Sequence, residues 1–257
     1  MKELKINPGR VKKKLIDFIR SNIHKKGFER AIVGLSGGLD STTVVYLACE
    51  ALGSNNVLGL IMPYRVTPRS DIIDAKDISR KLAINVRYIN ITDMAEAYFK
   101  KVNLKDKIRR GNKIARERMS ILYDQSKEFN GIVIGTSNRT EILLGYGTIY
   151  GDTACAINPL GGLYKTQVIQ LARFLRVPKS IINKIPSAGL WRGQTDEGEL
   201  GLKYKDVDRF LYYFIDEKYT IGQIMKKGFS KDFIYKAIDK VKKNRFKCQL
   251  PKIARIK

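Results

Sequence analysis

One stretch of the chain decides its fold class, AIVGLSGGLDSTT at residues 31–43. An apolar segment runs into two glycines, a carboxylate and hydroxyl groups, and then into an amphipathic helical pattern. Glycines let the backbone turn sharply, and the helix N-terminus that follows offers free N–H groups to an anion. Asp40 would repel a bound phosphate unless a divalent cation lay between them, so the stretch predicts a phosphate site that uses Mg²⁺.

The loop matches neither the Walker pattern nor the Gly-x-Gly-x-x-Gly dinucleotide fingerprint. It resembles the Ser-Gly-Gly-x-Asp-Ser motif of the PP-loop ATP pyrophosphatases, where the loop grips the pyrophosphate leaving group of ATP. The resemblance implies that a continuous run binds ATP, namely Gly34, Leu35, Ser36, Gly37, Gly38, Leu39, Asp40 and Ser41, with Asp40 also a Mg²⁺ ligand. The structural alternative is a strand–helix turn in which Asp40 and the serines only cap the helix.

Apolar segments that read as strands alternate with helical patterns. Strands are expected at 32–35, 57–62, 84–91 and 131–135, and helices at 9–25, 42–52, 70–82 and 113–128. This alternation predicts an α/β fold, a parallel twisted sheet with helices on both faces. Strands buried in such a sheet should be continuously apolar. The superfamily resemblance implies the adenine nucleotide alpha hydrolase-like version of this fold.

The second half of the chain is less regular. A Gly-rich stretch at 145–163 precedes a helix expected at 165–175. Residues 187–201 have several glycines and little periodicity, so we interpret them as a mobile loop. A helical C-terminal part with a basic tail is expected at 203–257. No clear linker interrupts the sequence, which predicts a single domain over 1–257.

The formal net charge of +24 attracts polyanions, and these include nucleotides as well as nucleic acids. The excess is spread along the whole chain, so specific nucleic-acid binding is not favoured. His24 is the only histidine and the three cysteines are scattered, which leaves no material for a zinc site, a Ser-His-Asp triad or a disulfide framework. No apolar run has the length of a membrane span and no signal peptide is visible, so a cytoplasmic protein is expected.

Four further segments resemble ammonia-dependent NAD synthetase, and together with the loop they span most of the chain in family order. In NKIARERM at 112–119, the resemblance implies that Arg116 binds deamido-NAD, since a guanidinium suits phosphate or carboxylate. In GTSNRTE at 135–141, it implies that Thr136 contacts ATP and that Glu141 is the second Mg²⁺ ligand. A solvated helix face and a capped helix start are the structural alternatives.

The third segment joins YGD at 150–152 to NPLGGLYK at 158–165. The resemblance places Asp152 near the nicotinate end of deamido-NAD. It implies that Lys165 holds ATP phosphate and stabilises charge as pyrophosphate leaves. A turn aspartate and a surface lysine at a helix start are the alternatives.

The fourth segment runs from PSAGL at 186–190 to DEGELG at 196–201. The resemblance implies a further ATP contact from Ser187 and a closing loop on which Trp191 would cover the site. An exposed acidic turn is the alternative.

The chain departs from the family pattern where the family binds deamido-NAD. Ile149 and Ala156 stand where bacterial members often carry a lysine and an aspartate, and Phe246 replaces a histidine. The next residue, Lys247, is kept and is expected to bind deamido-NAD. The ATP-binding motifs therefore follow the family more closely than the substrate-binding ones.

The resemblance implies an AMP-forming ligase. The nicotinate carboxylate of deamido-NAD would attack ATP to give an acyl-adenylate and pyrophosphate, and ammonia would then displace AMP to form NAD. Lys165 and Asp152 are the candidate catalytic residues, with Asp152 taking a proton from ammonium. The family also implies a homodimer supplied by free ammonia or by a separate glutaminase subunit.

Two other functions fit part of the sequence. A tRNA-modifying PP-loop enzyme suits the positive charge, but such thiolases generally use paired cysteines that this chain lacks. A non-enzymatic, basic RNA-binding module also suits the charge but leaves the carboxylate in the phosphate loop unexplained.

Overall fold

The sheet is parallel throughout. The computed structural model describes residues 2–249 and 253–254, and within them four strands lie in the order β3-β2-β1-β4. They are β1 (Arg30–Gly34), β2 (Val57–Ile61), β3 (Asn85–Tyr88) and β4 (Gly131–Ile134). These are the four strands expected from the sequence, so the prediction of a parallel α/β fold is confirmed.

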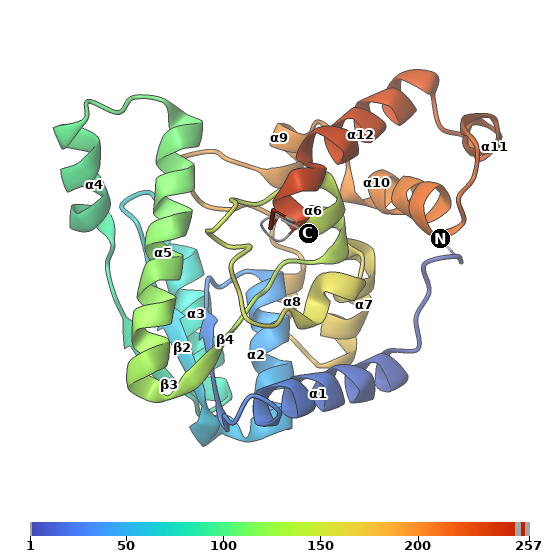
Figure 1. Ribbon diagram of the computed structural model, residues 1–257. Helices are drawn as coiled ribbons and strands as arrows, with labels where there is room; N and C mark the ends of the chain where they lie inside the picture. The colour runs from blue at the N-terminus through green and yellow to red at the C-terminus, as the bar shows by residue number, and fades with distance from the viewer. Residues whose placement is uncertain (1, 250–252, 255–257) are drawn as a thin grey trace.

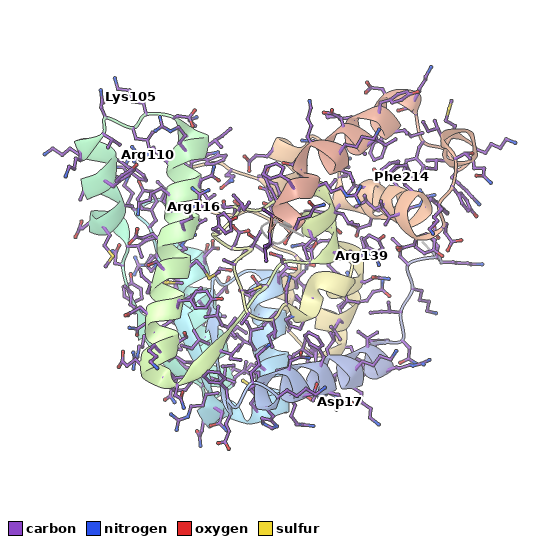
Figure 2. All side chains as sticks on the ribbon, in the orientation of Figure 1. Asp17, Lys105, Arg110, Arg116, Arg139 and Phe214 are labelled. Carbon is purple, nitrogen blue, oxygen red and sulfur yellow. The ribbon has the colours of Figure 1, made fainter. Side chains whose placement is uncertain are left out.

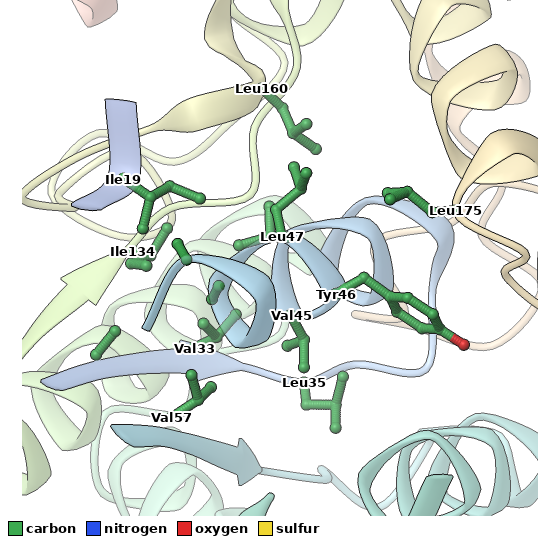
Figure 3. Close-up of a cluster of buried hydrophobic side chains, with 14 of the residues drawn as sticks. Ile19, Val33, Leu35, Val45, Tyr46, Leu47, Val57, Ile134, Leu160 and Leu175 are labelled. Carbon is green, nitrogen blue, oxygen red and sulfur yellow. The ribbon is translucent and has the colours of Figure 1, made fainter. Parts of the chain in front are cut away.

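Successive residues of each strand enter cores on opposite faces of the sheet. Ala31 and Val33 of β1 pack into one core, and Ile32 between them packs into the other. The helices that cover the first face are α1 (Pro8–His24), α2 (Leu39–Leu52), α3 (Arg69–Lys81) and α7 (Lys165–Phe174), and those on the second are α4 (Thr92–Lys101) and α5 (Lys107–Phe129). Figure 3 shows the first core, where Val45 and Leu47 of α2 lie above β1.

In the sheet and the helices of its second face, three elements differ from the sequence prediction: α4, α5 and β3. Helix α4 was not predicted, although Ala95 and Phe99 are buried at helical spacing. Helix α5 begins at Lys107 rather than at residue 113, because Asp106 accepts a hydrogen bond from the Arg109 N–H and caps the helix. Strand β3 is not buried along its length, since it lies at the edge of the sheet.

The order of the strands fixes where a ligand can bind. From β1 the chain moves outward to β2 and β3, and it then returns to place β4 on the other side of β1. In open α/β sheets, ligands bind outside the carboxyl ends of the strands at such a reversal. The phosphate loop follows β1 and the Thr136 segment follows β4, so both lie at this edge.

The C-terminal helices build a third core, away from the sheet. Helices α10 (Tyr204–Leu211) and α12 (Lys231–Asn244) pack against α6 (Arg139–Leu144), and α11 (Ile221–Met225) adds Ile224 to the same core. These C-terminal helices gather on one side of the molecule in Figure 1. This is the small C-terminal helical region that the sequence predicts. No helix in the described part of the chain combines the length and apolar character needed to cross a membrane.

The N-terminal arm joins the core of the C-terminal helices. Leu4 is buried among its apolar side chains. The carboxylate of Glu3 accepts hydrogen bonds from Arg209 Nε at 3.2 Å and from the Tyr213 hydroxyl at 2.9 Å. Hydrogen bonds to the carboxylate, outweighing burial, lower the pKa of Glu3 to about 2. The first residues of the chain are thus held by some of the last helices.

Candidate active site

A cleft of about 1550 Å³ opens at the carboxyl ends of β1 and β4. It is lined by the phosphate loop, one face of α5, the segment after β4, the start of α7 and residues 181–199. Ordinary small-molecule sites have volumes of roughly 300–1,000 Å³. This cleft therefore has room for two large ligands.

The phosphate loop is shaped by one glycine in particular. Gly37 has φ = 75°, and a side chain there would begin 2.1 Å from the carbonyl oxygen of Asp71, so only glycine fits. The hydroxyls of Ser36 and Ser41 lie 2.9 Å apart and close the loop. No side chain caps α2, which starts after Gly38. The capping alternative therefore fails, and free N–H groups at the helix start can bind an anion.

Three charged groups predicted from separate motifs meet beside this loop. The ammonium group of Lys165 forms an ion pair with Asp40, and its Nζ lies 3.6 Å from Glu141 Oε1. Lys165 is the first residue of α7 and is only 3% exposed. Asp40, Glu141 and Lys165 are called the ion cluster below.

The charges of the ion cluster shift one another's pKa values. Burial, reinforced by the charge of Asp40 and opposed by Lys165, raises the pKa of Glu141 to about 8. Burial alone would lower the pKa of Lys165, but the nearby carboxylates outweigh it and the net shift is upward. The lysine therefore stays protonated while it holds two acidic groups together.

Glu141 is oriented by the start of its own helix. Asn138 Oδ1 accepts the Glu141 N–H at 3.0 Å, and Glu141 Oε2 accepts the Asn138 N–H at 3.2 Å. This reciprocal capping box fixes the glutamate side chain. Its other oxygen is left to face Lys165. Thr136, just upstream, is half-buried and lines the cleft.

Residues 187–201 are more structured than the sequence predicts. They contain α9 (Asp196–Leu200), which Thr195 caps by accepting the Gly198 N–H. Asp196 is 5% exposed and accepts hydrogen bonds from the hydroxyls of Tyr146 and Tyr204, each at 3.0 Å. The prediction of a loop was wrong for residues 196–200, where the Tyr146 hydroxyl, 50 positions away, and the Tyr204 hydroxyl, 8 positions away, hold the first residue of α9.

The start of this segment lies over the cleft. Gly111 of α5 lies directly beneath Leu190 and Trp191, whose side chains a Cβ there would meet at 3.1 and 3.3 Å. Ser187 is exposed and lines the cleft. Its hydroxyl accepts the Gly189 N–H at 3.1 Å.

A second group of predicted residues lies around residues 145–153, called the 145–153 loop below. The carboxylate of Asp152 accepts the Thr148 N–H at 2.8 Å and lines the cleft. The residue as a whole is exposed, but the cleft walls around its carboxylate keep water partly away. This partial burial raises the pKa of Asp152.

The two basic residues predicted to bind deamido-NAD contact the backbone of this loop. Lys247 Nζ donates to the carbonyls of Gly145 and Gly147, at 2.9 and 3.2 Å. Arg116 Nε donates to the Ile149 carbonyl at 3.1 Å. Arg116 is exposed on α5, where Figure 2 labels it. Its side chain does not line the cleft, whereas that of Lys247 does.

Several cationic residues that line the cleft were not predicted, and two of them contact the backbone of its walls. Arg118 on α5 donates from Nε to the Met62 carbonyl at 3.1 Å, and burial lowers its pKa to about 10. Lys184 pairs with Asp71 at 2.8 Å and also donates to the Gly37 carbonyl at 3.3 Å. The arginine stood within a quoted motif and could have been singled out. For the lysine, no local pattern gives a signal.

The strand order, the glycine-shaped loop and the ion cluster together define an α/β nucleotide-binding protein of the PP-loop class. The family model described as NAD synthase matches residues 11–251. The chain belongs to that family.

Similarity to relatives and to solved structures extends over nearly the whole of the chain. The chain is 46% identical to the NH(3)-dependent NAD(+) synthetase of Fusobacterium nucleatum, with 100% of both chains covered. Among solved structures it is similar to an NMN synthetase from Francisella tularensis, with a TM-score of 0.87, 33% identity and 97% and 99% of the two chains covered. It is also similar to an NH3-dependent NAD synthetase from Campylobacter jejuni, with a TM-score of 0.84, 32% identity and 98% and 100% covered.

Proposed function

We propose that this chain is a C–N bond-forming ligase that amidates deamido-NAD with ammonia, using ATP and releasing NAD, AMP and pyrophosphate. The observation that carries the proposal is the ion cluster. Asp40, Glu141 and Lys165 come from three separate family motifs and converge beside the phosphate loop. An RNA-binding module has no need of buried carboxylates at that place.

The phosphate loop would hold the β- and γ-phosphates of ATP on the free N–H groups of α2. Lys165 would face the bridging oxygen and stabilise the negative charge that develops as pyrophosphate leaves. The nicotinate carboxylate forms a bond to the α-phosphorus, and the bond from that phosphorus to pyrophosphate breaks. Ammonia then adds to the acyl carbon, and AMP leaves with the bonding electron pair.

Asp152 is our candidate for accepting a proton from ammonium. Its raised pKa brings it nearer to the working pH, which improves a general base. Its backbone contact to Thr148 orients the carboxylate. Thr136 and Ser187 line the cleft as further ATP contacts, and Arg116 and Lys247 are proposed to bind deamido-NAD.

The ion cluster suits Mg²⁺, which prefers carboxylate and phosphate oxygens. Asp40 and Glu141 would hold it, and the ion would supply charge neutralisation at the phosphates. Among the described residues no set of three or more His, Cys, Asp or Glu side chains could bind a metal alone. Phosphate oxygens of ATP and water would supply the other ligands.

Asp40→Asn tests the magnesium proposal. The variant should lose activity by a factor on the order of 10²–10³ and should need more Mg²⁺ for half-maximal rate, measured by titration at fixed ATP. Asp77→Asn is the matched control, because Asp77 is exposed on α3 and pairs with Arg80 at 2.7 Å, away from the cleft. An unchanged Mg²⁺ requirement in Asp40→Asn would contradict this assignment.

A homodimer is also proposed. Three aromatic side chains at or near the 145–153 loop are exposed: Tyr150 lies in the loop, Tyr123 lies on α5, and Phe246 precedes Lys247, which donates to two carbonyls of the loop. Tyr123 lies beside it through a 2.7 Å hydrogen bond to the Ala154 carbonyl. Exposed apolar groups that cluster in this way mark contact surfaces.

The function is tested with purified protein, ATP, Mg²⁺, ammonium and deamido-NAD. Formation of NAD, AMP and pyrophosphate in equal amounts is the expected result, and release of ADP would contradict it. Nicotinate mononucleotide is offered in a parallel reaction, because one structural neighbour is an NMN synthetase. Faster turnover of nicotinate mononucleotide would show that the mononucleotide, and not deamido-NAD, is the preferred substrate. The proposed type of reaction would stay the same.

A further inference from the structure

One fully buried carboxylate has no part in the chemistry above. Asp208 on α10 has no exposed surface, and burial of a carboxylate is costly without hydrogen bonds. It lies on the buried face of its helix, between Tyr204, Val207 and Leu211, which all enter the C-terminal core. An acidic residue at this position needs partners from other elements.

Both oxygens of Asp208 accept hydrogen bonds from other helices. Thr140 Oγ1 on α6 donates to Oδ1 at 2.5 Å, and the N–H of Thr166 in the first turn of α7 donates to Oδ2 at 2.8 Å. The N–H of Lys165 donates to the same Thr140 hydroxyl at 3.0 Å. A chain of buried hydrogen bonds thus runs from Asp208 through Thr140 to the backbone of Lys165.

Helix α7 needs these contacts for its first two N–H groups, those of Lys165 and Thr166. The Gln167 side chain accepts only the N–H of Tyr164, the residue before the helix, at 3.0 Å. The first N–H groups of a helix have no partner inside it. Tyr164, which precedes the helix, is not a capping residue type, and its hydroxyl bonds to Asp216 instead, at 2.9 Å. The Thr140 hydroxyl and the Asp208 carboxylate take the place of a cap. A negative charge at this end of a helix is also favourable.

We propose that Asp208 is a positioning residue for the ion cluster. It fixes the first turn of α7, and so the base of the Lys165 side chain, through the contacts to Thr140 and Thr166. Glu141 follows Thr140 on α6, so the same contact holds the second member of the cluster. The C-terminal helical core, which lies outside the sheet, would thereby set the distance between Lys165 and Glu141. This inference rests on the proposed role of Lys165 in ATP binding.

Steady-state kinetics of Asp208→Asn test the proposal, because an amide presents one acceptor to two donors. We expect the KM for ATP to rise about tenfold or more, as for the loss of a charged hydrogen bond. The KM for deamido-NAD should stay within about twofold. Thr140→Val should act in the same direction, and Thr140→Ser, which keeps the hydroxyl, should remain close to the wild type. If Asp208→Asn does not fold, the comparison of Thr140→Val with Thr140→Ser tests the proposal instead.

Val207→Ala is the matched control for lost stability. Val207 precedes Asp208, is fully buried and touches neither Thr140 nor Lys165 through a hydrogen bond. It should lower the melting temperature without changing the KM for ATP. If Asp208→Asn and Thr140→Val also lower the melting temperature and leave the KM for ATP unchanged, Asp208 has only a structural role and the inference is overturned. Lys165→Met separates the two proposals, since normal ATP kinetics in that variant would refute the role of Lys165 itself.

Discussion

The ion cluster and the 145–153 loop hold their charged groups in different ways. In the ion cluster, side chains from three helix starts meet one another; Lys165 is buried, and Asp40 and Glu141 are half-buried. At the 145–153 loop, the basic side chains of Arg116 and Lys247 contact backbone carbonyls and remain partly exposed. A helix start fixes a side chain closely, whereas a loop held by long, flexible side chains can adjust. The first arrangement suits a triphosphate held in one position, and the second suits a substrate around which the loop can adjust.

The largest effect should come from removing the cation of the ion cluster. Lys165→Met leaves the half-buried carboxylates of Asp40 and Glu141, whose side chains are 16% and 15% exposed, without their partner. Breaking a fully buried ion pair typically destabilises a protein by about 3–5 kcal/mol, which sets the upper end of the expected loss. We expect kcat/KM for ATP to fall by a factor on the order of 10³, measured together with thermal unfolding. Lys14→Met, at an exposed lysine of α1, should change neither quantity. Near-normal ATP kinetics in Lys165→Met would show that the ion cluster does not bind ATP more closely than the 145–153 loop binds its substrate.

A smaller effect is expected at the edge of the 145–153 loop. Arg116→Ala should raise the KM for deamido-NAD about tenfold, the loss of one charge-assisted hydrogen bond, with little change for ATP. Arg116→Lys should recover part of it, since a point charge cannot reproduce a two-pronged contact. Arg109→Ala, exposed on the same helix, is the control. A selective defect in Arg118→Ala instead would move the role to the arginine that lines the cleft.

Lys247→Met should have a still smaller effect. It removes the hydrogen bonds to Gly145 and Gly147, each worth about 0.5–1.5 kcal/mol. The KM for deamido-NAD should rise by roughly threefold to tenfold, while the KM for ATP stays constant. Lys242→Met on the exposed face of α12 serves as the control. Equal changes for both substrates would show that the two regions are not independent.

The smallest effect concerns stability against pH. In the folded protein the pKa of Glu141 is about 8, above its ordinary value of 4.5. Between these values the folded state binds more protons, so this contribution to stability is present below pH 4.5 and is lost as the pH rises through 8. The melting temperature should therefore fall more steeply with pH in the wild type than in Glu141→Gln, by a few degrees. Parallel curves would contradict the raised pKa of Glu141.

The same contrast explains how far the sequence could be interpreted. The strand–loop–helix unit around Gly37 is local, and its residues alone predict its shape. Arg116 and Arg118 lie two positions apart on a helix and so point about 200° apart. Which of them enters the cleft depends on how α5 packs, and a motif does not contain that information.

Residues stabilised by distant partners were the hardest to predict. Lys184 meets Asp71 across 113 positions of sequence, and no local pattern marks it. Asp208 does leave a trace, because it interrupts the apolar face formed by Val207 and Leu211. A carboxylate on a buried helix face predicts a buried polar partner, although not which one.

The N-terminal arm has a consequence for the order of assembly. Glu3 precedes its partners Arg209 and Tyr213 by 206 and 210 positions. During synthesis a chain emerges from the ribosome N-terminus first, so the arm waits undocked until α10 has left the exit tunnel. A segment made early is thus among the last to reach its folded position. A polypeptide released before α10 would lack the core that buries Leu4, and chaperones and proteases act on chains with exposed apolar side chains.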